Sequence, residues 1–214
     1  MDTTSEVMGE RSRLRAAAAL RNLGHAMVAH RADDAVLERV ADLADELAVA
    51  VMGGPLVERT VADEVARLAE PVPPDGAVVD HGVLCPVSGH ANPLGLAMTA
   101  RRVGDAVHAT VTLAAAAAGS PGIAHGGVVA ALLDDVMGFV LDSLQRTPGY
   151  TARLEVHFRK PVPVGVPLGV RGQMRRRDGR KLFIDAVVEQ HGTTLAEAEA
   201  LFLAIDLDTA AALS

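Results

Sequence analysis

The sequence is poor in aromatic residues and in cysteine. It contains no Trp, one Tyr, four Phe and a single Cys among 214 residues. One cysteine excludes an intramolecular disulfide, which agrees with a reducing compartment. With so few rings, the core has to be built from Ala, Val and Leu, and stacking platforms for nucleic-acid bases are not expected.

An excess of positive charge and a long apolar run are also missing. Lys and Arg number 20 against 27 Asp and Glu, for a net charge of −7, and the basic residues are scattered, so a nucleic-acid partner is not expected. The alanine-rich stretch near the start is interrupted by Arg21 and Asn22, and it is too short for a signal peptide or a membrane span. We therefore expect a cytoplasmic protein without a membrane partner. Half of the residues are hydrophobic, which is enough for a sizeable core.

The chain divides into two parts by its hydrophobic periodicity. Residues 10 to 70 are helical in pattern, and "EPVPPDG", residues 70 to 76, is typical of a linker. Asp33 or Asp34 can cap the second helix, and an acidic first turn follows Thr60 in the third. We expect a helical N-terminal extension over residues 1–75 and a second domain over residues 76–214. One face of the second helix is apolar through Val36, Val40, Leu43, Leu47 and Val51.

Beyond the linker the period changes to two. Alternating runs flank the dipeptides Gly104-Asp105, Asp178-Gly179 and His191-Gly192, which predicts antiparallel hairpins. Between the first and second of these lies "AHGGVVAALLDDVMG", residues 124 to 138, whose spacing is helical. The order of two strands, one helix and three or four long strands predicts an α+β layer arrangement.

The predicted helix carries carboxylates in an apolar run. If it begins near Gly127, then Asp134 lies two turns further along, on the side of small residues such as Ala130 and Ala131. The bulky residues occupy the remaining surface and are expected to pack under the sheet. Asp134 should therefore face a slot, while Asp135 points about 100° away, to the surface or behind Asp134.

The motifs "HGGVVAALLDDVMG" and "GYTARLEVHFRKPVPVG", with weaker matches in "GRKLFIDAVV" and "LAEAEALFLAI", resemble the PaaI-like hotdog thioesterases. The resemblance covers residues 92 to 206 and leaves out residues 1 to 75. It implies a hotdog fold, in which a curved antiparallel sheet wraps a central helix. It also implies hydrolysis of acyl-CoA to the free acid and CoA, without metal or cofactor.

The resemblance assigns roles to individual residues. Asp134 matches the catalytic carboxylate, acting as general base on water or as nucleophile. His125 matches a histidine that orients the oxyanion turn, the amides of Gly126 and Gly127 match carbonyl polarisers, and Thr151 matches a hydroxyl that positions water or the carboxylate. The implied assembly is a homodimer with shared active sites, or a dimer of dimers. Expected substrate-binding residues are Ala130 and Ala131 in the slot, Asn92 at the entrance, and Arg159 and Lys160 for CoA phosphates.

Other interpretations have to be weighed against this one. A non-catalytic acyl-CoA-binding hotdog protein is the main alternative, and a metal-dependent hydrolase would have to use "DHGVLCPVSGH", residues 80 to 90, where no paired ligand spacing repeats. A Gly-x-Ser-x-Gly elbow is missing. "GHANPLG" resembles the hydratase motif of hotdog enoyl-CoA hydratases, but His90 and Gly95 replace its Asp and His. A solvated hairpin end is a simpler interpretation of the basic residues Arg175, Arg176, Arg177, Arg180 and Lys181 than a phosphate site.

Overall fold

The computed structural model describes residues 3–58, 60–79 and 81–205. Three helices come first, α1 (Thr3–Ala29), α2 (Asp34–Met52) and α3 (Val61–Ala69), and a fourth, α4 (Gly126–Phe139), follows later. α4 continues into a short π-helical turn, η2 (Val140–Leu144), and a 3-10 turn, η1 (Ala115–Ala117), precedes it. The strands are β1 (Val78–Val79), β2 (Thr99–Val103), β3 (Ala106–Thr112), β4 (Ala118–Ser120), β5 (Ile123–Ala124), β6 (Gly149–Phe158), β7 (Pro167–Asp178), β8 (Lys181–Gln190) and β9 (Thr193–Ala204).

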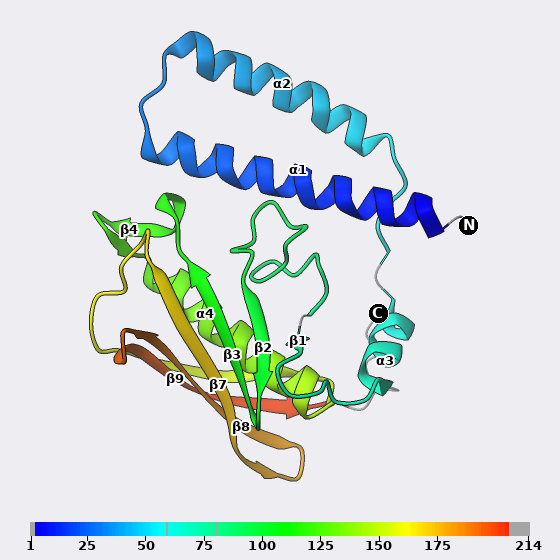
Figure 1. Ribbon diagram of the computed structural model, residues 1–214, viewed down its shortest axis with the longest axis vertical. Helices are drawn as coiled ribbons and strands as arrows, with labels where there is room; N and C mark the ends of the chain where they lie inside the picture. Colours follow the sequence, from blue (N-terminus) through cyan, green and yellow to red (C-terminus); the bar gives the residue numbers. More distant parts are fainter. Residues whose placement is uncertain (1–2, 59, 80, 206–214) are drawn as a thin grey trace.

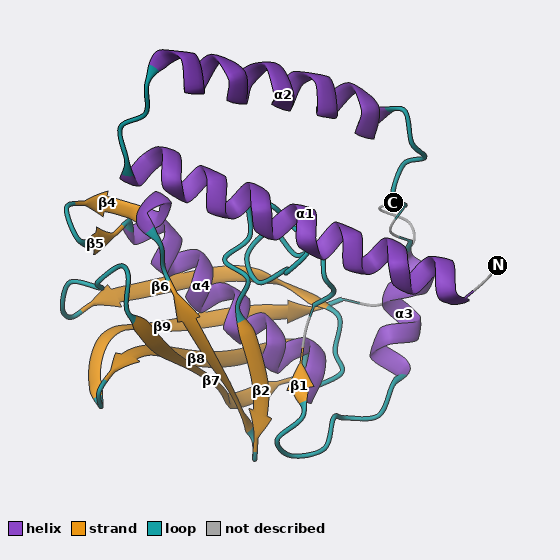
Figure 2. Cartoon of the chain, turned by 45° about the horizontal axis from the view of Figure 1, so that its top comes forward, coloured by secondary structure: helices purple, strands orange, loops and turns teal. Residues whose placement is uncertain are grey.

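Seven of these strands form one antiparallel sheet in the order β1-β2-β3-β7-β8-β9-β6. The sheet curves around α4, which runs along its inner face (Figures 1 and 2). A curved antiparallel sheet around one central helix is the hotdog fold, so the expected fold class is confirmed.

The alternation of apolar residues explains why these strands form. Leu182, Ile184, Ala186 and Val188 of β8 are all buried, as the period-two pattern predicts. On α4 the bulky side chains are buried beneath the sheet: Val129, Leu132, Leu133, Val136 and Met137. The small residues Ala130 and Ala131 remain partly exposed, together with Asp134. The two predicted faces of the helix are therefore confirmed.

Two of the three predicted hairpin turns are correct in register. Val103 pairs with Ala106 across Gly104-Asp105, and Gln190 pairs with Thr193 across His191-Gly192. The third turn is wrong by one residue, because Asp178 pairs with Lys181 and the turn is formed by Gly179 and Arg180. Gly179 has a φ of +56°, which a glycine at the first central position of a two-residue turn adopts readily.

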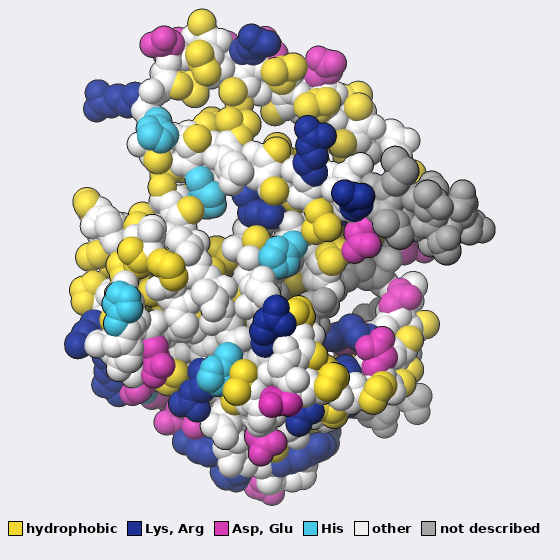
Figure 3. Space-filling model, in the orientation of Figure 1, with side chains coloured by type: hydrophobic (Ala, Val, Ile, Leu, Met, Phe, Trp, Pro, Cys, Tyr) yellow, Lys and Arg dark blue, Asp and Glu magenta, His cyan; other side chains and the backbone are white. Residues whose placement is uncertain are grey.

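The helices α1 and α2 lie together above the sheet and α4 in Figure 1, and α3 lies apart from them at the right of the view. α1 contacts the loop between β1 and β2 through Arg21. The Arg21 guanidinium donates to the carbonyl oxygens of His90 at 2.9 Å and Asn92 at 2.6 Å. The predicted apolar face of α2 exists, but none of its residues is buried, so in the single chain this face has no packing partner. Hydrophobic side chains are visible along α1 and α2 in Figure 3.

Among the helices of the described residues, none combines the length and the hydropathy that crossing a bilayer requires.

Close approach of β7 to α4 depends on Gly172. A Cβ atom built there would lie 3.0 Å from Cγ1 and 3.1 Å from the backbone oxygen of Val136. We expect Gly172→Ala to lower the free energy of unfolding by about 1–3 kcal/mol, because the extra carbon overpacks the helix–sheet contact. Gly169→Ala on the same strand is the matched control, since its Cβ would meet nothing nearer than 3.8 Å. Urea denaturation measures both, and equal stabilities would contradict the expectation.

Candidate active site

His125 forms the N-cap of α4 and determines how the helix begins. Its backbone is extended, with φ −64° and ψ 133°, and its Nδ1 atom accepts a hydrogen bond from the Gly127 amide at 3.0 Å. The His125 amide in turn donates to the Ala117 carbonyl oxygen at 2.8 Å, which fixes the residue to η1. Histidine therefore does here what Ser, Thr or Asp do at other helix starts. The acceptor role also requires Nδ1 to be unprotonated in this arrangement.

Gly126 presents an open amide at the same helix start. Among the hydrogen bonds of the described residues, its N–H takes part in none, whereas that of Gly127 is bonded to His125. Unpaired N–H groups at a helix N-terminus attract negative charge. Of the two glycine amides expected to polarise a carbonyl, Gly126 is thus available as the chain stands, and Gly127 becomes available if the imidazole turns away.

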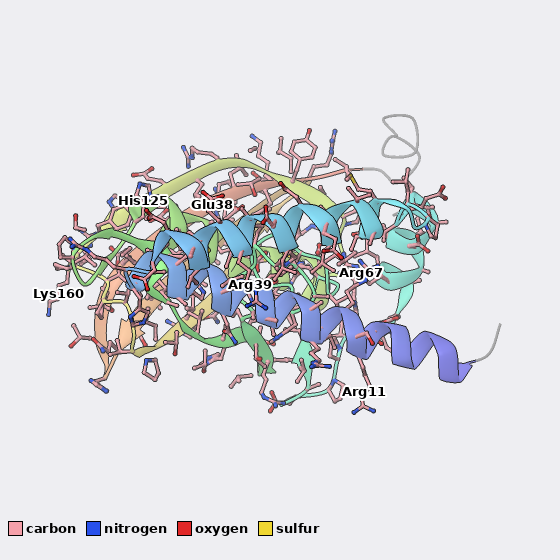
Figure 4. The ribbon with its side chains drawn as sticks, turned by 90° about the horizontal axis from the view of Figure 1, so that it is seen from above. Arg11, Glu38, Arg39, Arg67, His125 and Lys160 are labelled. Carbon is pink, nitrogen blue, oxygen red and sulfur yellow. The ribbon has the colours of Figure 1, made fainter. Side chains whose placement is uncertain are left out.

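A surface pocket of about 400 Å³ lies beside Gly126. Phe158, Arg159 and Lys160 contribute to its wall, so the start of α4 and two basic residues border one recess. Arg159 forms an ion pair with Glu197 of β9, while the Lys160 side chain is exposed. His125 and Lys160 lie at the same end of the molecule in Figure 4. Gly126, Arg159 and Lys160 thus border the same pocket, and the expected contact of the two basic residues with CoA phosphates stays a prediction.

Asp134 lies two turns further along α4 and is bonded to Thr151. The Thr151 hydroxyl donates to Oδ1 of Asp134 at 2.8 Å, so these two residues are in contact. Burial is the largest influence on this carboxyl and raises its pKa. The Thr151 hydrogen bond and the His81 charge oppose this effect and the Asp135 charge adds to it, with a net pKa above the ordinary value. A carboxylate of raised pKa is a stronger base once ionised.

A β-bulge directs Thr151 at the helix. β6 pairs with β9 through Thr151 and Phe202 and then through Arg153 and Leu201, so Ala152 is the extra residue. Because of the bulge, the side chains of Thr151 and Leu154 lie on the same face of the sheet, the face toward α4. In a regular strand, residues three apart would lie on opposite faces. The hydroxyl reaches Asp134 only because of this irregularity.

A partly buried polar network behind Asp134 joins α4 to the N-terminal region. His81 contacts Asp142 of η2 through Nδ1 at 2.8 Å and the backbone oxygen of Asp135 through Nε2 at 3.0 Å. Arg67 of α3 donates to Asp142 at 3.0 Å. The sequence analysis singled out His81 only as a weak metal ligand and missed Arg67 and Asp142, because 75 residues separate this pair in sequence. Arg67 lies at the opposite end of the molecule from His125 (Figure 4).

Three other expectations have different outcomes. The side chain of Asn92 accepts from the Leu94 amide at 2.9 Å and donates to the Leu84 oxygen at 3.2 Å, so it braces its own loop, and the geometry gives its expected substrate contact no support. Asp135 lies behind Asp134, with a side chain only 8% exposed, and the surface position considered for it is wrong. In the described part of the chain no group of three His, Cys, Asp or Glu residues is arranged to hold a metal ion.

Comparison with known proteins agrees with this architecture. The family model of the thioesterase superfamily matches residues 121–197, which include α4 and β6 to β8. A solved crystal structure described as a thioesterase superfamily protein superposes with a TM-score of 0.76 at 30% identity. The superposition covers 89% of this chain and 90% of that one. A match over 89% of this chain is longer than residues 76–214, so the structural likeness extends into the N-terminal helices.

Curated relatives match over a shorter length. The acyl-coenzyme A thioesterase THEM4 of Mus musculus is 32% identical over 90 residues, covering 41% of this chain and 38% of that protein. THEM4 of Bos taurus is 33% identical over 90 residues, which cover 41% of this chain and 36% of that protein. The matched part of the chain thus spans at most about two fifths of the length of these curated relatives. Together with the near full-length structural match, these findings show that the chain belongs to the thioesterase superfamily.

Proposed function

We propose that this chain is a thioester hydrolase that cleaves acyl-CoA to the free acid and CoA, with Asp134 as its catalytic carboxylate. The observation that carries the proposal is the contact between Asp134 and Thr151 on the open face of α4. The acyl-CoA thioesterase relatives support the substrate class. The N-terminal helices of residues 1–75 are then an extension to a hotdog domain of PaaI-like type.

The proposed chemistry follows from the hydrogen bonds of Asp134. Thr151 occupies Oδ1, so the second oxygen can accept a proton from water. The water oxygen then bonds to the thioester carbonyl carbon, the carbonyl electrons move onto oxygen, and an amide at the start of α4 stabilises that charge. When the C–S bond breaks, the CoA thiolate takes the proton from Asp134. Attack by the carboxylate itself, through an anhydride that water then opens, uses the same residues.

This chemistry requires two chains. Gly126 and Asp134 are eight residues apart on one rigid helix, which is about 12 Å at 1.5 Å per residue. They cannot act on the same carbonyl, so in this proposal the Gly126 amide that serves Asp134 belongs to a second copy. β6 supports this assembly, because it is an edge strand of ten residues, none of them buried in the single chain. We therefore propose a homodimer with shared sites, which two-fold symmetry completes twice.

The carboxylate can be tested by an isosteric change. We expect Asp134→Asn to lower kcat for acyl-CoA hydrolysis by about 10²–10⁴-fold with little change in KM, since the amide keeps the shape but cannot accept the proton. Asp105→Asn, at an exposed hairpin turn, is the matched control. Thiol release from acyl-CoAs of graded chain length measures both. Equal turnover of the two variants contradicts the role of Asp134, and acyl-CoA binding without any release by the wild type would favour the binding-protein alternative.

The shared site predicts complementation between two inactive variants. Gly126→Pro removes the open amide, and the backbone tolerates it because His125 is already extended and proline suits the first helical position. A heterodimer of Asp134→Asn and Gly126→Pro has one site with both defects and one with neither. Refolding the two together at equal amounts should restore about a quarter of wild-type activity. A site built within one chain would restore none.

The two lysines of the chain offer a test of CoA recognition. Lys160 lines the pocket beside Gly126, whereas Lys181 lies at the β7–β8 hairpin. We expect Lys160→Glu to raise KM for acyl-CoA about tenfold, because a negative charge replaces a cation that faces the phosphates. KM for the matching acyl-pantetheine thioester, which lacks the nucleotide, should stay constant. Lys181→Glu is the control, and an equal effect of both changes would exclude specific recognition by Lys160.

A further inference from the structure

His81 is a largely buried histidine held between α4 and η2. Its side chain is only 14% exposed, and its ring stacks on Phe139 with centroids 4.0 Å apart. Gly138 makes room for it, since a Cβ at that position would lie 3.0 Å from Cε1 of the ring. The absence of one side chain on α4 thus lets an imidazole lie against the turn that follows Asp134.

The hydrogen bonds of His81 define its charge. Nε2 faces the backbone oxygen of Asp135 at 3.0 Å, and a carbonyl oxygen can only accept, so Nε2 has to carry a proton. Nδ1 faces the Asp142 carboxylate at 2.8 Å, which is also an acceptor. Both nitrogens therefore donate, and the ring is an imidazolium.

The electrostatics of the cluster agree with a charged ring. Burial by itself lowers the pKa of His81, but the hydrogen bond to Asp142 and the charges of Asp135 and Asp142 outweigh it, and the pKa lies above the ordinary 6.5. Burial likewise raises the pKa of Asp142, while the hydrogen bond and charge of His81, with help from Arg67, hold that pKa below its usual range.

The network reaches both the catalytic turn and the N-terminal helices. Asp135 Oδ1 accepts from the Cys85 thiol at 3.2 Å and lies 3.7 Å from Nε2 of His81. At the other end, Arg67 bonds to Asp142 and also to Glu64 of its own helix. Within residues 3–58, 60–79 and 81–205, the charged and titratable groups that contact this cluster are Glu64, Arg67, Cys85, Asp135 and Asp142.

We propose that His81 is a positioning residue for Asp134. Its imidazolium holds the Asp134–Asp135 turn of α4 through the Asp135 carbonyl, links that turn to Asp142 and α3, and places a positive charge near two adjacent carboxylates. The inference rests on the proposed function, because it assigns His81 a part in the same site. His81 does not touch the reacting atoms.

The test compares two histidine variants. His81→Gln keeps a donor for one partner but cannot donate at both ends, and it removes the charge. His108→Gln changes an exposed histidine of β3 in the same way and is the matched control. We expect kcat of His81→Gln to fall about 10–100-fold with KM within threefold, because the base is misplaced. The acid limb of its pH profile should move to higher pH, since the His81 charge lowers the pKa of Asp134. A profile that coincides with that of His108→Gln overturns the inference.

Asp142→Asn provides a second variant should the first fail to fold. It keeps the shape of the partner but removes the charge that raises the pKa of His81, so the imidazolium should lose its proton at lower pH. We then expect kcat of this variant to decrease with rising pH at a lower pH than kcat of the wild type does. A constant profile in this variant contradicts the inference.

The charge of His81 can also be read without any turnover. In ¹⁵N-histidine spectra at pH 7.5, assigned with His81→Gln, both ring nitrogens of His81 should be protonated. A neutral tautomer overturns the inference whatever the activity. Thiol release by the wild type tests the proposed function separately, so an inactive protein with a charged His81 would refute the thioesterase and leave the assignment of the ring standing.

Discussion

The packing of one face of α4 against the concave sheet is the constraint on which the rest of the structure depends. Val129, Leu132, Leu133, Val136 and Met137 are all buried there, and this fixes the rotation of the helix about its axis. A rotation by one residue, about 100°, would drive a carboxylate toward the core, which costs several kcal/mol without a partner. The apolar face therefore determines where Asp134 points, and the small residues beside it leave that side open.

The ends of α4 are held by two different histidines. His125 accepts at the N-terminus and leaves the Gly126 amide open, whereas His81 donates near the C-terminus and joins the helix to η2 and, through Asp142, to α3. One imidazole has to be unprotonated at Nδ1 and the other has to be charged, because their partners are a donor and two acceptors. On the proposed function, the same helix thus presents positive dipole at one end and a base of raised pKa in its middle.

Periodicity and spacing predicted the parts of the fold that depend on local pattern. The order of strands and helix, the two faces of α4 and the register of the turn at Gly104 follow from apolar alternation and glycine chemistry. The approach of Thr151 to Asp134 came from the family resemblance, because it depends on a bulge at Ala152 that no sequence period reveals. The contact of Arg67 with Asp142 depends on how distant elements pack. The apolar spacing of α2 predicts a packed helix, but no other element of the described chain covers its apolar face. The exposure of this face depends on tertiary packing, which the sequence pattern does not show.

The dimensions of α4 explain why assembly and catalysis would be coupled in this fold. An α-helix cannot shorten the distance of about 12 Å between its first amide and a carboxylate eight residues on, so no side-chain movement brings the two together. In the proposed dimer the start of α4 from the second copy would approach Asp134, and by two-fold symmetry the Asp134 of the second copy would receive the amide of the first. The edge strand β6 carries Thr151 and ends at Phe158 beside the Gly126 pocket. Pairing of this edge with its symmetry mate would therefore bring the base, its hydroxyl partner and the opposite amide into register through one strand.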